Sequence, residues 1–314
     1  MSTEPLQRRI GRRKLLTGAA GGAMAVGAAA IIGCGDDDDE QAAPDWGGQV
    51  VSRFVRTDVP EDPWASLWDR APRVEIPMQP QSSALPLRMQ PSVPAIRVRS
   101  LNDGKRIGFL LEWSDPQRDE HAVKTTQFRD GCGVLLGPPD VPAAFFMMGV
   151  TDRAASILHW RADWQKDIDD GFQDLESAFP NVAFDFYPPL VDAPRPLVIS
   201  DDYPVRGRPW LPGMHAGNPL SQPTKRSPVE RLLANGPGTI THLPTQDATG
   251  RGIWNEGRWK VVLTRELDAS NAEEVGLKAG SEYALAFTIW AGSEGDRGSR
   301  KSPSNLGKLL IGEA

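Results

Sequence analysis

Hydrophobic and polar residues alternate with a period of two along much of the chain from about Trp46 onward. In the stretch 106–113, one side carries Ile107, Phe109, Leu111 and Trp113. Leu110 interrupts the polar side, but the period still predicts a strand. An Asn-Asp-Gly sequence at 102–104 separates this strand from an earlier apolar one that contains Ile96 and Val98. The pattern therefore predicts a β-hairpin.

The last quarter of the chain repeats this pattern. Glu256 and Gly257 form a turn signal between two short apolar stretches, 253–254 and 259–263. Between 283 and 290, one side carries Tyr283, Leu285, Phe287 and Ile289, and the other carries Ala284, Ala286, Thr288 and Trp290. Antiparallel sheet is the natural interpretation.

One helix is signalled between Ser227 and Gly236. Ser227 stands at the N-cap, Pro228 at the first helical position and Glu230 where it closes a capping box, and Gly236 follows the apolar pair at 232–233. The segment 187–223 is rich in Pro and Gly and has no clear period. Loops of that length within a domain are usually functional or covered by a partner.

Composition supports a fold with many turns. The 314 residues include 28 Pro, 31 Gly and ten Trp against three Tyr, with 39% hydrophobic and 24% charged residues. These values suit a globular domain with many connections and few long helices. We predict a mainly β fold, an antiparallel β-sandwich with a few short helices and long loops, over residues 46–314.

The first 34 residues have the features of an export signal. Four arginines and Lys14 precede an Ala/Gly-rich apolar run from 15 to 32. Residues 11–17, Gly-Arg-Arg-Lys-Leu-Leu-Thr, resemble a twin-arginine signal, and Ile-Ile-Gly-Cys at 31–34 resembles a lipoprotein cleavage box. Together they predict export and lipidation of Cys34, which would anchor the protein on the outer side of a membrane. The alternative is an uncleaved N-terminal anchor with a chance cysteine.

Residues 35–45 form an acidic stretch without pattern, and we predict a linker there. Removal of residues 1–33 leaves 30 basic and 40 acidic side chains, a net charge of −10. This charge argues against a nucleic-acid partner. With Cys34 lipidated, Cys132 is the one thiol left, so an intrachain disulfide is not expected. The sequence contains no Cys-x-x-Cys-His for covalent haem, and no Cys or His pair has the spacing of a zinc site.

Several segments, in chain order, resemble the haem-binding γ subunits of the type II dimethylsulfoxide reductase family, which includes ethylbenzene dehydrogenase, dimethylsulfide dehydrogenase, selenate reductase and chlorate reductase. The matching pieces are Leu-Glu-Trp-Ser-Asp at 111–115, Phe-Arg-Asp at 128–130, Phe-Met-Met-Gly at 146–149, His-Trp-Arg-Ala-Asp-Trp at 159–164, Gly-Ile-Trp to Gly-Arg-Trp at 252–259, Ala-Phe to Trp at 286–290, and Gly-Ser-Arg-Lys-Ser at 298–302. Two features depart from the family: Gly-Cys-Gly at 131–133 replaces an Ala-rich segment, and a lipid anchor is unusual.

The resemblance implies a non-catalytic electron-transfer subunit that holds one b-type haem between a methionine and a lysine. Carried onto this sequence, these axial ligands are Met148 and Lys301. It also implies a complex with a molybdopterin catalytic subunit and an iron–sulfur subunit, and electron exchange with a soluble cytochrome or a quinone-linked partner outside the cytoplasm. A haem used only for electron transfer needs both axial positions filled by protein.

Three alternatives stay open at this stage. Met147 competes with Met148, because neighbouring residues on a strand point to opposite faces. His159 is the histidine within a matching segment, although a packed histidine fits that position equally well. The tryptophans at 113, 160, 164, 254, 259 and 290 are more simply explained as sandwich core than as an electron relay, and some could line the haem pocket.

A different class of function also fits the predicted fold. A β-sandwich lipoprotein that binds carbohydrate or another solute on aromatic residues would share the export signal and the tryptophans. A hydrolase is less supported, because the sequence has no Gly-x-Ser-x-Gly and no metal-ligand cluster. The substrate of the partner enzyme does not follow from the sequence.

Overall fold

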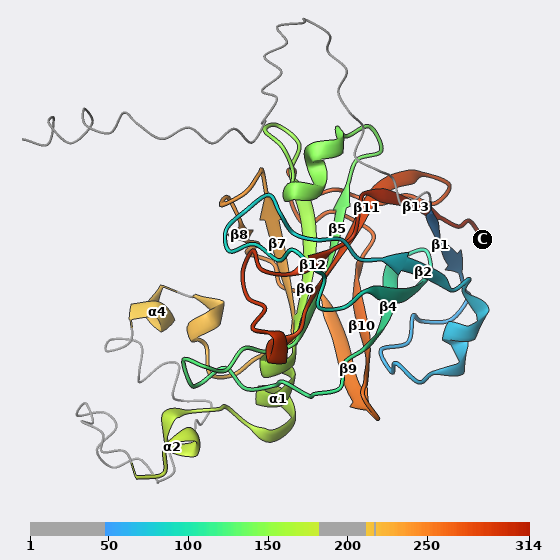
Figure 1. The fold of residues 1–314 in the computed structure, drawn as a ribbon. Coiled ribbons are helices and arrows are strands. Elements are labelled where there is room, and N and C mark those ends of the chain that lie inside the picture. Colours follow the sequence, from blue (N-terminus) through green and yellow to red (C-terminus); the bar gives the residue numbers. More distant parts are fainter. Residues whose placement is uncertain (1–47, 182–211, 217) are drawn as a thin grey trace, which may run out of the picture. The chain divides into compact units, whose positions relative to one another are not determined.

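The computed structural model describes residues 48–181, 212–216 and 218–314. They form a mainly β fold around one large sheet, whose strand order is β8-β7-β6-β5-β11-β13-β1-β3-β4-β10-β9, with β12 beside β11 and β2 beside β3 (Figure 1). The strands are β1 (Gln49–Phe54), β2 (Val74–Pro77), β3 (Ala95–Asn102), β4 (Arg106–Ser114), β5 (Gly131–Gly137), β6 (Ala155–Arg161), β7 (Val229–Ala234), β8 (Thr241–His242), β9 (Thr249–Asn255), β10 (Arg258–Glu266), β11 (Glu282–Trp290), β12 (Ser302–Pro303) and β13 (Gly307–Ile311).

Short helices join these strands. The 3-10 segments are η1 (Ser66–Arg70), η2 (Ala143–Met147), η5 (Pro219–Ser221) and η6 (Gly292–Glu294), and the α-helices are α1 (Ala162–Asp170), α2 (Leu175–Ala178) and α4 (Pro212–His215). Over the described ranges, no helix has the length and apolar character needed to cross a membrane.

The sheet bends so that its two halves face each other across the main core. Trp160 on β6 meets Trp259 on β10, with ring centroids 5.0 Å apart, although the two strands lie far apart in the strand order. Apolar side chains from both halves, such as Phe109 and Phe287, belong to one buried cluster. The mainly β prediction is confirmed. The sheet is mixed, because β1 runs parallel to both β13 and β3.

Both hairpins predicted from the sequence are present. Strands β3 and β4 pair antiparallel around the turn at 103–105, where the Asp103 carboxylate accepts hydrogen bonds from the backbone N–H groups of Lys105 and Arg106 at 2.8 and 2.7 Å. Strands β9 and β10 join through Glu256 and Gly257, which both have positive φ. Such a pair is typical of the two-residue turns that match the twist of a hairpin.

The predicted helix at 227–236 is wrong, because this segment contains β7. All six residues of β7 are buried, and the strand pairs with β6 on one side and β8 on the other. The Ser227 hydroxyl does accept a hydrogen bond from the Val229 N–H. Glu230, however, forms an ion pair with Arg161 of β6 instead of closing a capping box. Strand pairing and burial therefore outweigh the local capping signals.

The export signal with Cys34, the linker and most of the Pro/Gly-rich segment 187–223 lie outside the described residues. From that segment the structure describes α4 and η5.

Candidate functional site

Met148 lies directly after η2, above the ends of strands β6 and β7. Its backbone is left-handed, with φ 82° and ψ 37°. The Met148 carbonyl accepts a hydrogen bond from the Gly236 N–H at 2.9 Å, and the Gly149 N–H donates to the Phe145 carbonyl at 2.9 Å. The segment is therefore a helical turn and not a strand, and the strand-alternation argument for choosing between Met147 and Met148 does not apply.

Gly149 allows the backbone beside Met148 to pack directly on these strands. A Cβ at this position would lie 2.4 Å from the Ala234 carbonyl oxygen and 3.0 Å from the Ala155 nitrogen, and φ is +84°. No other residue type tolerates both conditions without displacement. The glycine thus holds Met148 against the sheet.

Lys301 lies at the end of the loop that follows η6. In the pairing of β11 with β12, Ser302 is opposite Ile289, which places Lys301 beside Trp290. The Ser302 hydroxyl accepts a hydrogen bond from the Ser92 N–H at 2.9 Å, so the 78–94 connection also fixes this register. The Lys301 ammonium nitrogen lies 5.3 Å from the centre of the Trp290 ring.

The structure brings the two predicted ligands together. Lys301 Nζ is 3.6 Å from Met148 Sδ, although 153 positions separate the residues in the chain. Within the described part of the chain, Met147 makes no such contact with Lys301. Met148 also packs on a second apolar cluster, separate from the main core.

The positive charge of Lys301 is not offset by a nearby negative charge in the described part of the chain. Among the described residues, no carboxylate lies within ion-pair distance of it, and burial lowers its pKa to about 8. Desolvation disfavours the ammonium form, so the neutral amine, which has a free lone pair, is unusually accessible. A thioether and an accessible amine that face each other form a donor pair of mixed softness, suited to a transition metal and not to Ca²⁺ or Mg²⁺.

The sheet face beneath this pair is lined by small and apolar side chains. It is the outer face of β5, β6, β7 and β11, and the second cluster consists of Leu135, Phe145, Ala155, Ile157, Leu232, Ala234, Ala284 and Ala286. Four of these eight residues are alanine, and Gly133 and Gly137 lie on the same face by strand alternation. A Cβ at Gly137 would lie 2.2 Å from the Phe145 ring, so η2 packs directly on this face, and every residue of the cluster is at most 9% exposed.

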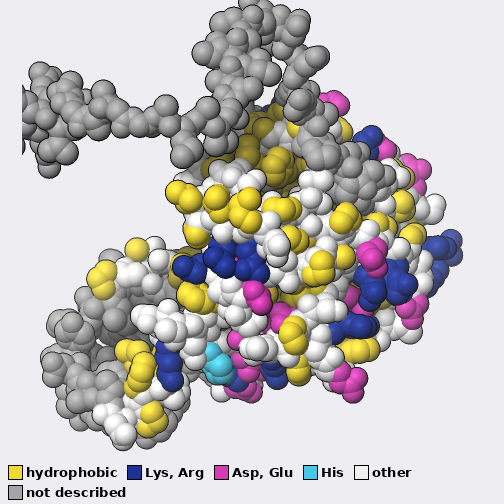
Figure 2. Space-filling view, viewed as in Figure 1, with side chains coloured by type: hydrophobic (Ala, Val, Ile, Leu, Met, Phe, Trp, Pro, Cys, Tyr) yellow, Lys and Arg dark blue, Asp and Glu magenta, His cyan; other side chains and the backbone are white. Residues whose placement is uncertain are grey.

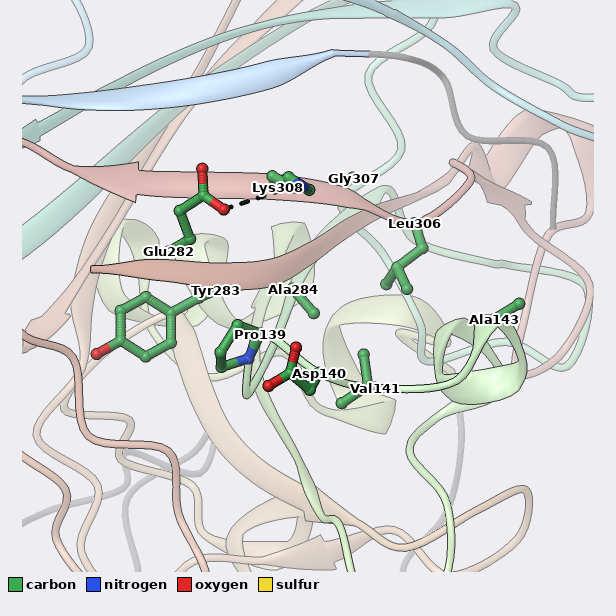
Figure 3. A pocket seen from close by; sticks show the side chains of 10 residues that line it. All are labelled: Pro139, Asp140, Val141, Ala143, Glu282, Tyr283, Ala284, Leu306, Gly307 and Lys308. Atoms are coloured by element: carbon green, nitrogen blue, oxygen red, sulfur yellow. Dashed lines mark ion pairs between the residues drawn. The ribbon is translucent and has the colours of Figure 1, made fainter. Parts of the chain in front are cut away.

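A shallow pocket continues this face at its Ala284 end. It has a volume of ≈ 320 Å³, and Figure 3 shows it lined by Pro139, Asp140, Val141 and Ala143, by the first residues of β11 and by the 306–308 segment. Val141, Ala284 and Leu306 belong to the pocket and also to, or against, the second cluster. Glu282 and Lys308 form an ion pair of 3.7 Å at its rim. The second cluster therefore extends to the surface of the molecule.

His159 lies near the donor pair, beside Trp290. Its ring stacks on Trp290, with centroids 4.7 Å apart and an interplanar angle of 31°. Burial lowers the pKa of His159 well below its usual value, and the positive charges of Arg161, Arg129 and Lys301 lower it further. The imidazole is thus neutral at pH 7. Across the described ranges, no group of three or more His, Cys, Asp or Glu residues is placed to hold a metal ion.

The tryptophans divide between two environments. Trp113, Trp160 and Trp259 are buried in the main core, as predicted. Trp290 lies on the outer face, where its indole N–H donates to the Gly298 carbonyl at 3.0 Å. From the sequence, the tryptophans are more simply explained as core, with some of them allowed to line the haem pocket. The alternation within 283–290 does place Trp290 opposite the apolar side, so the signal was present.

Comparison with known proteins gives one consistent group of relatives. Residues 65–177 and 235–302, more than half of the chain, match the family described as Ethylbenzene dehydrogenase. A putative respiratory nitrate reductase heme subunit of Haloferax mediterranei is 24% identical over 81% of this chain and 69% of its own length.

Two further relatives are named as γ subunits. Dimethylsulfide dehydrogenase subunit gamma of Rhodovulum sulfidophilum is 22% identical over 79% of this chain and 73% of its own length. Chlorate reductase subunit gamma of Ideonella dechloratans is 21% identical, with coverages of 76% and 74%. A carbohydrate binding module of Caldicellulosiruptor kristjanssonii in complex with glucose gives a TM-score of 0.37 at 9% identity, covering 85% of this chain and 97% of its own. That likeness is too distant to bear on the ligand.

Proposed function

Because this chain belongs to the ethylbenzene dehydrogenase family, we propose that it is the haem-binding electron-transfer subunit of a molybdenum enzyme complex, with one b-type haem held by Met148 and Lys301. It is not the catalytic subunit, as its haem-subunit and γ-subunit relatives indicate. The single observation that carries the ligand assignment is the 3.6 Å approach of Lys301 Nζ to Met148 Sδ.

The residues at the site fit this cofactor chemically. A b-type haem would supply a one-electron couple. The thioether of Met148 is a soft donor, which favours the ferrous state and a raised potential. Lys301 can bind iron only as the neutral amine, and its burial already lowers the pKa to about 8. With Met148 and Lys301 both bound to it, the iron would offer no open position to oxygen or substrate.

The names of the relatives support the proposed partners. Reductases of nitrate and chlorate and a dehydrogenase of dimethylsulfide are the complexes to which those subunits belong. We infer an analogous catalytic molybdenum subunit here, together with an iron–sulfur subunit. A soluble cytochrome or a quinone-linked protein would exchange electrons with the haem.

Spectra of ligand variants test the haem proposal. Met148→Ala should open one axial position, give a high-spin or water-ligated spectrum and lower the potential. Met147→Ala is the matched control and should leave the low-spin spectrum unchanged. Lys301→Ala should also lose the low-spin spectrum. If both ligand variants kept it while His159→Ala abolished it, the assignment would be wrong, and a colourless protein that binds sugars would overturn the haem function itself.

The proposed location has a separate test. The twin-arginine and lipoprotein signals support export followed by anchoring through Cys34 on the outer side of a membrane. Cys34→Ala, produced without partner subunits, should move the protein from the membrane to the soluble extracytoplasmic fraction. Continued membrane retention of this variant would contradict the lipid anchor.

A further inference from the structure

The outer face of the sheet changes from apolar to charged along the strands. Strand pairing aligns Ala286, Leu135, Ile157 and Leu232 in one row across β11, β5, β6 and β7. Every member of this row is apolar, and all four belong to the second cluster on which Met148 packs. This row therefore forms the hydrocarbon-like end of the face.

The next two rows are polar. Thr288, Gly133, His159 and Glu230 align in the first, and Trp290, Gly131 and Arg161 align in the second. Lys301, beside Trp290, approaches from this polar side, and Met148 approaches from the apolar side. The face beneath the donor pair is therefore amphiphilic in one direction, along the strands.

Arg161 is the cation at the polar end, and it has hydrogen-bonding capacity left. The residue is 8% exposed, and its Nε is buried without a hydrogen-bond partner. One terminal nitrogen donates to the Glu230 carboxylate, and the guanidinium lies 4.7 Å from the centre of the Trp164 ring. A guanidinium carries five donors, so this arrangement leaves a buried donor unsatisfied, which costs stability.

Arg129 reinforces the positive charge at this end. Its Nε lies 2.9 Å from the Asp163 carboxylate, and its positive charge lowers the pKa of both His159 and Arg161. Burial is the largest cause of the lowered pKa of Arg161, and the opposing effect of Glu230 is smaller. Arg161 and Arg129 are thus each paired with one carboxylate, Glu230 and Asp163, and the buried Nε of Arg161 is the donor left for a further anion.

We propose that Arg161, assisted by Arg129, binds the propionate carboxylates of the haem and so fixes the orientation of the cofactor on the sheet. Because Met148 and Lys301 would address opposite faces of the macrocycle, its plane would stand between the apolar row and the Trp290–Arg161 row, and its carboxylate edge would point across the strands from β11 towards Arg161 on β6. A haem is itself amphiphilic, with its charged groups on one edge, and charge-assisted hydrogen bonds to Arg are about twice as strong as neutral ones. This inference rests on the proposed haem function and adds the residues that orient the group.

A change in the ligand tests this inference without altering the fold. The haem-free full chain is loaded either with protohaem or with its dimethyl ester, which lacks the two carboxylate charges, and the rate of haem transfer to an excess of a high-affinity acceptor is followed by absorbance. The ester should leave the wild-type protein faster by roughly tenfold or more, since it loses charge-assisted hydrogen bonds.

Variants of the two arginines test the same inference from the side of the protein. Arg161→Gln/Glu230→Gln removes the buried ion pair without leaving one charge uncompensated, and Arg129→Gln removes the second cation. Both should release protohaem faster and reduce its advantage over the ester. Arg251→Gln, which changes an exposed arginine paired with Asp169, is the control and should keep that advantage.

The outcomes separate the two claims. If the wild-type protein held protohaem and the ester equally well, or if the variants weakened both equally, the propionate assignment would be overturned while the haem function stood. If the chain took up neither compound, the proposed function itself would fail. An unchanged low-spin spectrum in Arg129→Gln, combined with faster release, would support a role at the carboxylates and not at the iron.

Discussion

The two faces of strands β5, β6, β7 and β11 differ in a way that separates stability from function. On the inner face the strands contribute large side chains, such as Trp160 and Phe287, to the main core. On the outer face the same strands contribute Ala284, Ala286 and the donor-rich rows around His159. Because alternate residues of a strand point to opposite faces, one sequence carries both patterns at once.

The faces also differ in how their buried charged groups are partnered, although the indole N–H groups of Trp113 and Trp160 in the main core lack a partner in the described part of the chain. In the main core, the buried Asp130 carboxylate accepts hydrogen bonds from the Trp259 indole and from the Asp119 and Gly292 backbone N–H groups. On the outer face, Lys301 has no recorded ion pair in the described part of the chain, and Met148 holds a left-handed backbone. Such strain and undercompensated charge gather at functional sites.

The largest expected effect is on the inner face. Trp259→Ala should lower the free energy of unfolding of the haem-free protein by about 3–5 kcal/mol, because it leaves a large cavity and deprives Asp130 of a donor. Urea unfolding measures the change. The control is Trp64→Ala, whose side chain is 52% exposed and should cost less than about 1 kcal/mol. Equal costs for the two variants would contradict the assignment of Trp259 to a rigid core.

The second effect is on the outer face and concerns the backbone beneath Met148. Gly149→Ala should destabilise the protein by roughly 2–4 kcal/mol, because the new Cβ meets the Ala234 carbonyl and φ is +84°. It should also weaken haem binding, since Met148 must move.

Gly238 provides a matched control for this variant. Its φ is +82°, and a Cβ there would meet nothing within 4 Å. Gly238→Ala should therefore lower the free energy of unfolding only through the left-handed backbone, by about 1–2 kcal/mol, and should leave haem binding intact. If the two alanine variants behaved alike, the close approach of residue 149 to the sheet would not be what holds Met148.

The hairpins show which parts of the fold could be predicted from the sequence. Their evidence is local, because the period of two and the turn residues, such as Asp103 and Gly257, act within a few positions. The segment 227–236 shows the limit: its capping signals are also local, but its partner strand is about 70 residues away. The ion pair between Arg161 and Glu230 forms only after that pairing.

The candidate site was predicted through family resemblance and not through local pattern. Met148 and Lys301 come from two loops, and no periodicity links positions 153 apart. The resemblance named them, and the structure brings them into contact. The strand pattern places Trp290 on the side opposite the core, but it does not show that Lys301 lies beside Trp290, because that requires the pairing of β11 with β12.

The smallest of the expected effects is a gain in stability instead of a loss, and it depends on pH. Burial lowers the pKa of Lys301 in the haem-free protein to about 8, whereas an unfolded chain has a lysine pKa of about 10.4. Above pH 10.4 this lysine is neutral in both states and does not oppose folding. As pH falls from 10.4 towards 8, the unfolded chain binds the proton first, so stability is lost. At pH 7 the full cost of burying the ammonium group therefore remains.

Lys301→Met removes that cost while keeping an apolar side chain of similar length over Trp290. The haem-free variant should be more stable than wild type at pH 7, on the order of 2–3 kcal/mol, and this difference should shrink as pH rises from 8 to about 10.4. Urea unfolding at pH 7 and pH 10 measures the effect. Lys308→Met, which changes an exposed lysine, should alter stability little at either pH. A destabilised Lys301→Met at pH 7 would mean that Lys301 supports the fold of the haem-free chain, and the contrast between a stabilising inner face and a costly outer face would not hold.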